Sequence, residues 1–311
     1  MDDQTALVLA LQLTALCCIA GSLLLYLVWK VRRSSSSDRG LSGGKSVLVT
    51  AAGSQLGLEV VLRLAQLGFR VFAGLHEPDG SPAKVLKAKV KQMEAEGKAH
   101  GAVVLMPLDC TREDSLHEAV DHVRRHLPAG QNGLWAVVNT AGYACKGRLE
   151  AQESAAWELM FRVNVVATLR TARALLPLLR VTQGRLVTLG LTGECCADGS
   201  GAVAYSAARH AVAGCSSALR QEIQPTGVSV IVVDAPKIRA ETLYRPVRPK
   251  QEGGVEAYTS YRTDLLPEYF LSGLEEVLLS NQIKERYELR PPVTMSSFLQ
   301  QRRKSNSHST V

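Results

Sequence analysis

The sequence has no CxxC pair, and none of its histidines stands at a zinc-binding spacing from a cysteine. His76 and His210, for which the sequence identifies no partner, are expected to face solvent. The seven cysteines are an odd number scattered along the chain, which is typical of reduced thiols in a cytosolic setting. The net charge of +7 is dispersed, whereas nucleic-acid binders gather charge on one helix or interleave it with aromatics. We therefore expect no metal site, no disulfide framework and no nucleic-acid partner.

The chain consists of an N-terminal segment of unusual composition followed by a sequence with the composition of a folded globular domain. Of its 311 residues, 46% are hydrophobic and 21% are charged, which is the normal range of folded domains. The length beyond the N-terminal segment suits one large α/β domain. We expect a tail and membrane anchor over 1–29, a flexible linker over 30–44, the globular domain over 45–290 and a disordered basic tail over 291–311.

The anchor is predicted from the long apolar run Ala6–Trp29. A helix of this length spans about 36 Å, which is enough to cross a hydrocarbon core of about 30 Å. A cleaved signal peptide is the alternative, but it has a basic start and a shorter apolar core, whereas this chain begins with Asp2 and Asp3. The same two acids, and the lack of early arginine, argue against a mitochondrial presequence. A retained transmembrane helix is the favoured interpretation.

The charges that flank this helix predict its orientation. Lys30, Arg32 and Arg33 follow it directly, and the positive-inside rule places this end in the cytosol. We therefore expect a single-pass protein whose globular domain faces the cytosol, with the endoplasmic reticulum as the expected membrane. Ser34–Ser37 and Gly40–Gly44 would form the tether.

From Lys45 onward, short β-branched runs alternate with longer amphipathic stretches. This order predicts parallel βαβ units with helices on both faces, and the right-handed crossover rule then gives an α/β, doubly wound, Rossmann-type parallel sheet. The expected strands are Ser46–Thr50, Phe69–Gly74, Ala102–Leu108, Leu134–Asn139, Arg185–Gly190 and Val228–Asp234. The expected helices are Gly57–Leu67, Ala83–Glu96, Arg112–Leu127, Ser154–Leu179 and Val203–Gln224.

Beyond Ala240 the pattern degrades. We expect a Pro-rich basic loop at Arg245–Lys250, a helix at Leu266–Leu279 and a short strand at Tyr287–Leu289. The C-terminus, His308–Val311, has a hydroxyl two residues before a terminal valine, the pattern that PDZ domains read. A PDZ-domain partner is one hypothesis for this tail.

A glycine-containing turn joins the first expected strand to the first expected helix. It reads Thr50-Ala51-Ala52-Gly53-Ser54-Gln55-Leu56-Gly57 and is called the nucleotide loop below. In a doubly wound sheet, such a turn lets a cofactor pyrophosphate approach backbone N–H groups at a helix N-terminus.

Further landmarks follow in order along the chain. They are Asp109 at the end of the third strand, Asn139-Thr140-Ala141-Gly142 after the fourth, Asn164 in the long helix, and Tyr205 four residues before Arg209. Over about Lys45 to Ala240, this ordered set resembles the short-chain dehydrogenase/reductase family. The phrases Gly68–Gly74 and Gly133–Val138 are most similar to the branch of 17β-hydroxysteroid dehydrogenase type 2, retinol dehydrogenases and 3-hydroxybutyrate dehydrogenase.

The resemblance implies a nicotinamide cofactor. The family loop reads Thr-Gly-x-x-x-Gly-x-Gly, and here Ala51 and Gln55 replace its first two glycines. Ala51 adds one methyl group, whereas the Gln55 side chain is expected to stand where the loop backbone meets the phosphate. Glu77 lies about 20 residues beyond Gly57, where an acid binds ribose hydroxyls and repels a 2′-phosphate, so we expect NAD in preference to NADP. The residues expected to bind it are Thr50, Gly53, Ser54, Gln55, Leu56, Gly57, Glu77, Asp109, Asn139, Ala141 and Gly142.

The resemblance also implies the catalytic residues Tyr205, Arg209, Asn164 and Thr192. The family tyrosine exchanges a proton with the substrate oxygen, and a lysine four residues later stabilises its phenolate; Arg209 supplies the charge here. Alignment by the strand puts Leu191 at the family serine, and alignment by spacing puts Thr192 there; only Thr192 has a hydroxyl. The alternatives are an ordinary partly buried tyrosine at 205, a surface position for Arg209, a turn position for Thr192, and an Asn164 that only bridges backbone groups across the helix.

Two functions are compatible with these residues. One is a membrane-anchored oxidoreductase that transfers a hydride between a nicotinamide cofactor and a lipophilic alcohol or ketone, such as a steroid, retinoid or hydroxy acid. The other is a catalytically impaired descendant that keeps the fold as a binding or scaffold module, which the changes at the glycine, serine and lysine positions favour. By analogy with the family, a homodimer would form through Ser154–Leu179 and Val203–Gln224.

Overall fold

The computed structural model describes residues 19, 21–22, 43–196, 201–252, 255–261 and 266–292. Apart from residues 19 and 21–22, the predicted anchor lies outside these ranges, as do residues 30–42 of the linker and the expected PDZ motif His308–Val311. Within the described ranges, no helix is both long and apolar enough to cross a membrane.

A sheet of seven parallel strands forms the centre of the domain, in the order β3-β2-β1-β4-β5-β6-β9. The chain starts near the middle, winds outward to β3, and then returns to build the other half. The expected doubly wound parallel sheet is confirmed. The strands are β1 Ser46–Val49, β2 Arg70–Leu75, β3 Val103–Pro107, β4 Ala136–Asn139, β5 Arg185–Thr192, β6 Ser229–Ala235 and β9 Arg286–Glu288.

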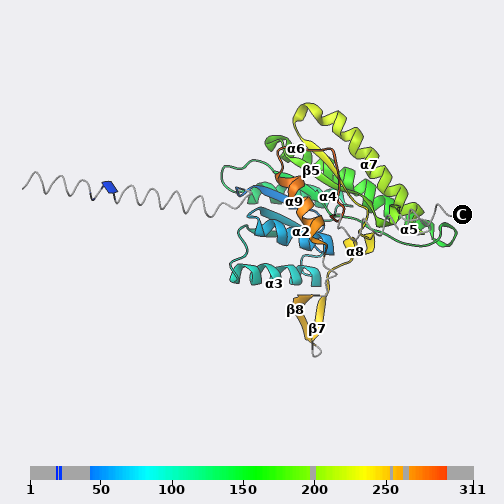
Figure 1. Ribbon diagram of the computed structural model, residues 1–311, viewed down its shortest axis with the longest axis horizontal. Coiled ribbons are helices and arrows are strands. Elements are labelled where there is room, and N and C mark those ends of the chain that lie inside the picture. The colour runs from blue at the N-terminus through cyan, green and yellow to red at the C-terminus, as the bar shows by residue number, and fades with distance from the viewer. Residues whose placement is uncertain are drawn as a thin grey trace, which may run out of the picture.

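Helices cover both faces of the sheet because the strands are apolar on both sides (Figure 1). In β1, Val47 and Val49 pack toward α2 and α9, whereas Leu48 packs toward α4, α6 and α7. All three side chains are fully buried. The helices are α2 Gln55–Gln66, α3 Ser81–Ala95, α4 Glu113–His126, α5 Ser154–Phe161, α6 Ala167–Thr182, α7 Val203–Ile223, α8 Ala240–Tyr244 and α9 Glu268–Leu279.

The expected single helix over Ser154–Leu179 is interrupted. It runs as α5 and α6 joined by a π turn over Arg162–Val166, and Asn164 lies inside this turn. Single π turns of this kind are frequent at functional sites, because the extra residue turns a side chain to a new direction.

The segment after Ala240 contains structure that the sequence pattern missed. A short helix, α8, is followed by an antiparallel hairpin of β7 Pro249–Glu252 and β8 Val255–Tyr261. The expected loop Arg245–Lys250 is therefore wrong at its end, where Pro249 and Lys250 open β7. The hairpin projects from the domain beside α3, and Lys84 of α3 lies over the Tyr258 ring (Figure 1). A short strand pair gives only a short alternation of polar and apolar residues, which explains the miss.

Candidate active site

A cleft of about 380 Å³ opens at the carboxyl ends of β1 to β4, the edge at which doubly wound sheets bind ligands. The nucleotide loop forms one side. Residues that follow β2, β3 and β4, together with residues near Val163 and Tyr244, form the rest. The lining includes Thr50, Gly53, Ser54, His76, Glu77, Asp109, Thr111, Ala141, Gly142, Val163, Tyr244 and Pro246.

The nucleotide loop is held by β4 and by its own helix cap. The Thr50 hydroxyl donates to Asn139 Oδ1 at 2.9 Å, and the Ala51 N–H donates to the Thr140 hydroxyl at 3.1 Å. Ser54 caps α2, because its hydroxyl accepts from the Gly57 N–H at 3.0 Å. A β-carbon at Gly57 would stand 1.9 Å from the Ala51 carbonyl oxygen. Glycine is thus required at 57 for the close approach of helix and loop.

Gln55 does not project into the cleft as expected. Its side-chain amide donates to Glu59 on the next turn of α2 at 3.2 Å, and the residue is buried. The expectation that this side chain would stand in the place of a phosphate is therefore wrong. The helix geometry carries the side chain back along α2, while the backbone N–H of Gln55 still points out of the helix end.

That N–H is used by a distant segment. The Gln55 N–H donates to the Arg245 carbonyl at 2.9 Å, the Val247 N–H donates to the Gly53 carbonyl at 3.0 Å, and Ser54 forms an antiparallel bridge with Pro246. We call the segment Tyr244–Val247 the strap. It lies across the N-terminus of α2, which explains why Gln55 and Leu56 are buried.

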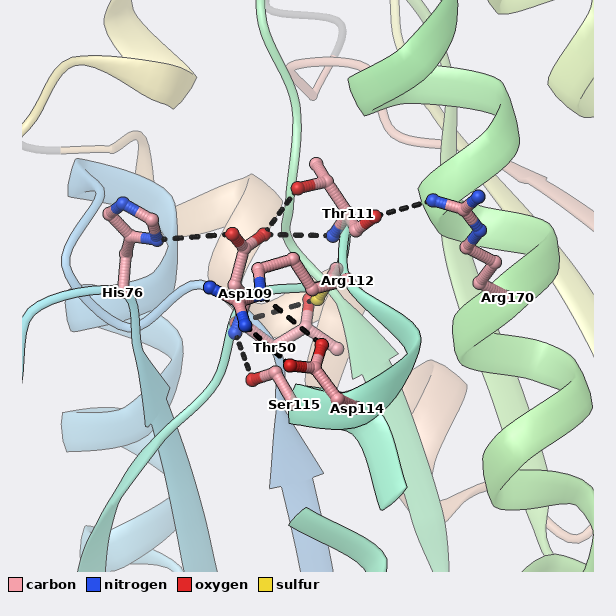
Figure 2. A network of polar contacts seen from close by, with 9 residues as sticks. Thr50, His76, Asp109, Thr111, Arg112, Asp114, Ser115 and Arg170 are labelled. Carbon is pink, nitrogen blue, oxygen red and sulfur yellow. Dashed lines mark hydrogen bonds and ion pairs between the residues drawn. The ribbon is translucent and has the colours of Figure 1, made fainter. Parts of the chain in front are cut away.

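Asp109 organises the far end of the cleft (Figure 2). Its Oδ1 accepts from both the N–H and the hydroxyl of Thr111, at 2.8 and 2.7 Å, and its own N–H donates to the Ser115 hydroxyl at 2.9 Å. His76 faces solvent as expected, but its Nδ1 lies 3.7 Å from Asp109 Oδ2, a partner that the sequence did not reveal. Glu77 is exposed beside it, so this end of the cleft is lined by acids.

Tyr205 and Arg209 lie on one face of α7 and are both buried, each about 1% exposed. The Arg209 Nε donates to the Tyr205 hydroxyl at 3.1 Å. Its other nitrogens donate to the Leu189 carbonyl at 3.2 Å, to Asn164 Oδ1 at 2.7 Å and to the Tyr244 hydroxyl. In the described part of the chain, no carboxylate pairs with this buried cation. The alternative of a surface arginine is wrong.

The partners of Arg209 determine its electrostatics. Burial works against the charged form, but the Tyr244 and Tyr205 oxygens outweigh burial and raise the pKa of Arg209. Burial also raises the pKa of Tyr244 well above its ordinary value, although Arg209 acts in the opposite direction. Arg209 is therefore a permanent buried cation, and Tyr244 is a neutral phenol that accepts from it.

Asn164 connects the long helix to this centre. Its Oδ1 accepts from Arg209 and from the Tyr143 N–H at 3.0 Å, and its Nδ2 donates to the Tyr143 carbonyl at 2.7 Å. Every polar atom of the side chain is used, and the residue is fully buried. The π turn thus places Asn164 where it fixes both the loop after β4 and the guanidinium.

Thr192, and not Leu191, faces the tyrosine. The Thr192 hydroxyl lies 3.3 Å from the Tyr205 hydroxyl, and Thr192 is fully buried at the end of β5. The pairing of β5 with β6 shifts register between Leu189 and Thr192, and the Leu191 N–H donates to Asp234 Oδ1 at 2.6 Å. This bulge turns the threonine inward, so the structure decides between the two alignments.

The structure gathers the expected residues into two groups. Tyr205, Arg209, Asn164 and Thr192 meet around one guanidinium. The cleft is lined by Thr50, Gly53, Ser54, Glu77, Asp109, Ala141 and Gly142, but not by Gln55, Leu56, Gly57 or Asn139. Tyr244 was missed because it falls where the sequence pattern degrades.

The open cleft fits only part of a nicotinamide dinucleotide. Its acid-lined end, with Glu77 and Asp109, suits the hydroxyls of an adenosine ribose. The pyrophosphate would need the N-terminus of α2, which the strap covers. The described arrangement therefore holds residues for the adenosine half, and the rest of the cofactor requires the strap to be elsewhere.

Comparisons with known proteins agree with this fold. The family model for short chain dehydrogenase matches residues 45–251. The mitochondrial D-beta-hydroxybutyrate dehydrogenase of Rattus norvegicus is 31% identical over 238 residues, which cover 76% of this chain and 65% of that protein. Estradiol 17-beta-dehydrogenase 2 of Mus musculus is 31% identical over 224 residues, which cover 69% of this chain and 52% of that protein. The chain thus spans less than two thirds of the length of either relative.

A solved structure shows the same fold. A metagenomic short-chain oxidoreductase in complex with NADP superposes with a TM-score of 0.60 at 18% identity, over 80% of this chain and 98% of that one. With the family model matched over most of the globular part, the chain belongs to the short-chain dehydrogenase/reductase family.

Proposed function

We propose that this protein is an oxidoreductase that interconverts a lipophilic alcohol and the corresponding ketone with a nicotinamide dinucleotide. The observation that carries the proposal is the contact of the Tyr205 hydroxyl with the buried Arg209 guanidinium at 3.1 Å. A phenol beside an unneutralised buried cation is suited to give and take a proton.

Tyr205 and its neighbours have separate roles in the proposed reaction. Tyr205 exchanges the proton with the substrate oxygen, and Arg209 stabilises the phenolate that remains. Thr192 orients the substrate oxygen through its hydroxyl, 3.3 Å from that of Tyr205. When bound, the cofactor supplies or accepts the hydride.

We further propose that NAD is the preferred cofactor. Glu77 and Asp109 make the adenosine end of the cleft acidic, which suits ribose hydroxyls and opposes a 2′-phosphate.

The proposed substrate is a steroid, a retinoid or a hydroxy acid. Steroid and hydroxy-acid substrates are suggested by the names of the two relatives, estradiol 17-beta-dehydrogenase and D-beta-hydroxybutyrate dehydrogenase. The apolar run Ala6–Trp29 supports a membrane anchor in the endoplasmic reticulum, with the domain in the cytosol. A greasy substrate would reach such a domain from the bilayer.

A scaffold function is the second candidate. It is favoured by the burial of Tyr205, which is only about 1% exposed and does not line the cleft. A group that exchanges a proton with substrate must come within hydrogen-bond reach of it.

Turnover that depends on Tyr205 separates the two candidates. The full-length chain, purified in detergent, is assayed with NAD(H) and NADP(H) against steroids, retinoids and hydroxy acids. Tyr205→Phe should abolish turnover and leave the fold intact, while Tyr287→Phe, on β9, should retain it. Turnover with no substrate, or turnover that survives Tyr205→Phe, would favour the scaffold.

A further inference from the structure

We propose that the strap, Tyr244–Val247, is a closure of the dinucleotide site that is latched by Tyr244 on Arg209, so that the cofactor binds fully only when the latch opens. This inference rests on the proposed function and adds a regulation of the same site. It is carried by three observations on the described residues.

First, the strap uses the anion-binding end of α2. The Gln55 N–H, at the first position of this helix, donates to the Arg245 carbonyl. The Gly57 and Leu58 N–H groups are already taken by the side chain and carbonyl of Ser54. A phosphate bound at a helix N-terminus depends on such first-turn N–H groups. The strap and a pyrophosphate therefore compete for one place.

Second, Tyr244 separates the cleft from Tyr205. A β-carbon placed on Gly142 would lie 2.3 Å from the Tyr244 ring and 2.5 Å from the Arg209 guanidinium. The space above Gly142 is thus filled by these two side chains. Tyr244 lines the cleft, whereas Tyr205 lies buried beyond it. With Tyr244 in place, no ligand in the cleft reaches the proposed proton donor.

Third, the strap is fixed at its ends and exposed in its middle. Val247 is buried, and Tyr244 inserts its hydroxyl between α7 and the loop after β4, while Arg245 and Pro246 are exposed. Two backbone hydrogen bonds and the Tyr244–Arg209 contact hold it. Losing a hydrogen bond to a charged group changes an equilibrium about tenfold or more, so the tyrosine hydroxyl is the main latch.

Tyr244→Phe tests the latch, because it removes the hydroxyl and keeps the ring. Tyr287→Phe is the matched control. Its hydroxyl is also hydrogen-bonded, in this case to the Lys284 N–H and the Gln282 carbonyl, but it lies on β9. The full chain in detergent is studied by amide hydrogen exchange and by NADH fluorescence titration. In Tyr244→Phe, we expect the Gln55 and Val247 amides to exchange about tenfold faster and NADH to bind about tenfold more tightly. The control should change neither.

A reversible disulfide tests the closure by holding the strap in its closed position. Ser54 and Pro246 are bridge partners, and facing residues of an antiparallel pair are close enough for a disulfide. Because Ser54 also caps α2, the Ser54→Cys single variant is the reference for NADH binding. Oxidised Ser54→Cys/Pro246→Cys should lose the NADH binding of this reference, and reduction should return binding to the reference level. NADH binding that is unaffected by the disulfide would overturn the closure.

The outcomes separate this inference from the function on which it rests. If wild type binds NADH as tightly as Tyr244→Phe, the latch is wrong and the oxidoreductase proposal stands. If the strap amides open in Tyr244→Phe but neither protein binds NADH or NADPH, the oxidoreductase proposal fails, and with it the claim that the strap closes a dinucleotide site. Unchanged exchange in Tyr244→Phe would overturn the latch directly.

Discussion

Arg209 shows what one residue determines at this site. Lysine offers one compact ammonium, whereas the guanidinium here donates in several fixed directions, to Tyr205, Leu189, Asn164 and Tyr244. The acceptors around this position are placed to receive hydrogen bonds from a planar guanidinium group.

Arg209→Lys should therefore destabilise the protein, even though it restores the family motif. A lysine cannot reach all of these acceptors, and each buried acceptor left unpaired costs about 1–3 kcal/mol. We expect the melting temperature to fall by about 2–4 °C for each kcal/mol lost, as measured by thermal unfolding. Turnover should fall in parallel. A gain of activity with unchanged stability would show that the site is an eroded lysine site after all.

Glu77 is the residue on which the cofactor preference rests. Removing its carboxylate should ease the repulsion of a 2′-phosphate. Glu77→Ala should therefore raise the affinity for NADPH relative to NADH by up to about fivefold, because an exposed charge pair contributes at most about 1 kcal/mol. Fluorescence titration with both nucleotides measures the ratio. Glu94→Ala, at an exposed acid on α3, is the control. An unchanged ratio would remove Glu77 from the argument.

At the scale of elements, the sequence predicts the strands and helices well where apolar periodicity is strong, as in α7 and the buried parallel strands. It fails where a local shape depends on a distant partner. The π turn places Asn164 in a hydrogen bond with Arg209, and the bulge before Thr192 accompanies a hydrogen bond from Leu191 to Asp234. The strap is set by hydrogen bonds to a loop far away in the chain. None of these contacts leaves a periodic signal.

The bulge in β5 should depend on Asp234. Its Oδ1 accepts from the Leu191 N–H, its other oxygen meets Arg286, and a β-carbon at Gly190 would lie 2.2 Å from Oδ1. Asp234→Ala should cost about 1–3 kcal/mol by leaving the Leu191 N–H unpaired, and it should lower turnover by releasing Thr192. Thermal unfolding and the Tyr205-dependent rate measure the two effects.

Asp234→Asn is the matched variant, because it keeps an acceptor for the Leu191 N–H and loses only the charge. The ion pair with Arg286 is half-exposed on the arginine side and contributes little. The asparagine variant should therefore resemble wild type in both measurements. Equal losses in the two variants would assign the effect to the charge and not to the bulge.

At the scale of the molecule, one chain of hydrogen bonds joins the nucleotide loop to the proposed catalytic tyrosine. It runs from Thr50 to Asn139, from Asn139 to Thr168 at 2.8 Å and from Thr168 to the Asn164 carbonyl at 2.7 Å. Arg209 then connects Asn164 to Tyr205. The nucleotide loop and the proposed proton donor are thus connected by an unbroken series of hydrogen bonds. This makes Asn139, which does not line the cleft, a positioning residue.

The charges beside the apolar run predict the topology of the whole chain. With Lys30, Arg32 and Arg33 in the cytosol, a glycosylation acceptor placed within Ser34–Ser37 should remain unmodified, whereas one added before Asp2 should be used. Glycosidase-sensitive gel shifts in cells measure both. The reverse pattern would place the domain in the lumen.

Exposed apolar side chains on the long helices support the expected homodimer. Phe161, Val166 and Leu169 are each about 40% exposed on α5, the π turn and α6, and Val203 is 57% exposed at the start of α7. A cluster of this kind at the surface of a domain is typical of a subunit interface. We therefore predict that two chains pair through these helices.

Leu169→Glu tests this pairing, because burying an unpaired carboxylate at an interface is costly. The variant should weaken dimerisation at least a hundredfold while leaving the melting temperature of the monomer nearly unchanged, as measured by light scattering coupled to size-exclusion chromatography. Val181→Glu is the control, since Val181 is 59% exposed at the far end of α6 and lies about a third of a helix turn away from the Leu169 face. Dissociation caused by both variants would show that the helix as a whole was disturbed, and dissociation caused by neither would place the interface elsewhere. Only selective loss with Leu169→Glu fits a dimer through the two long helices, which would also hold α7, with Tyr205 and Arg209, against a fixed surface.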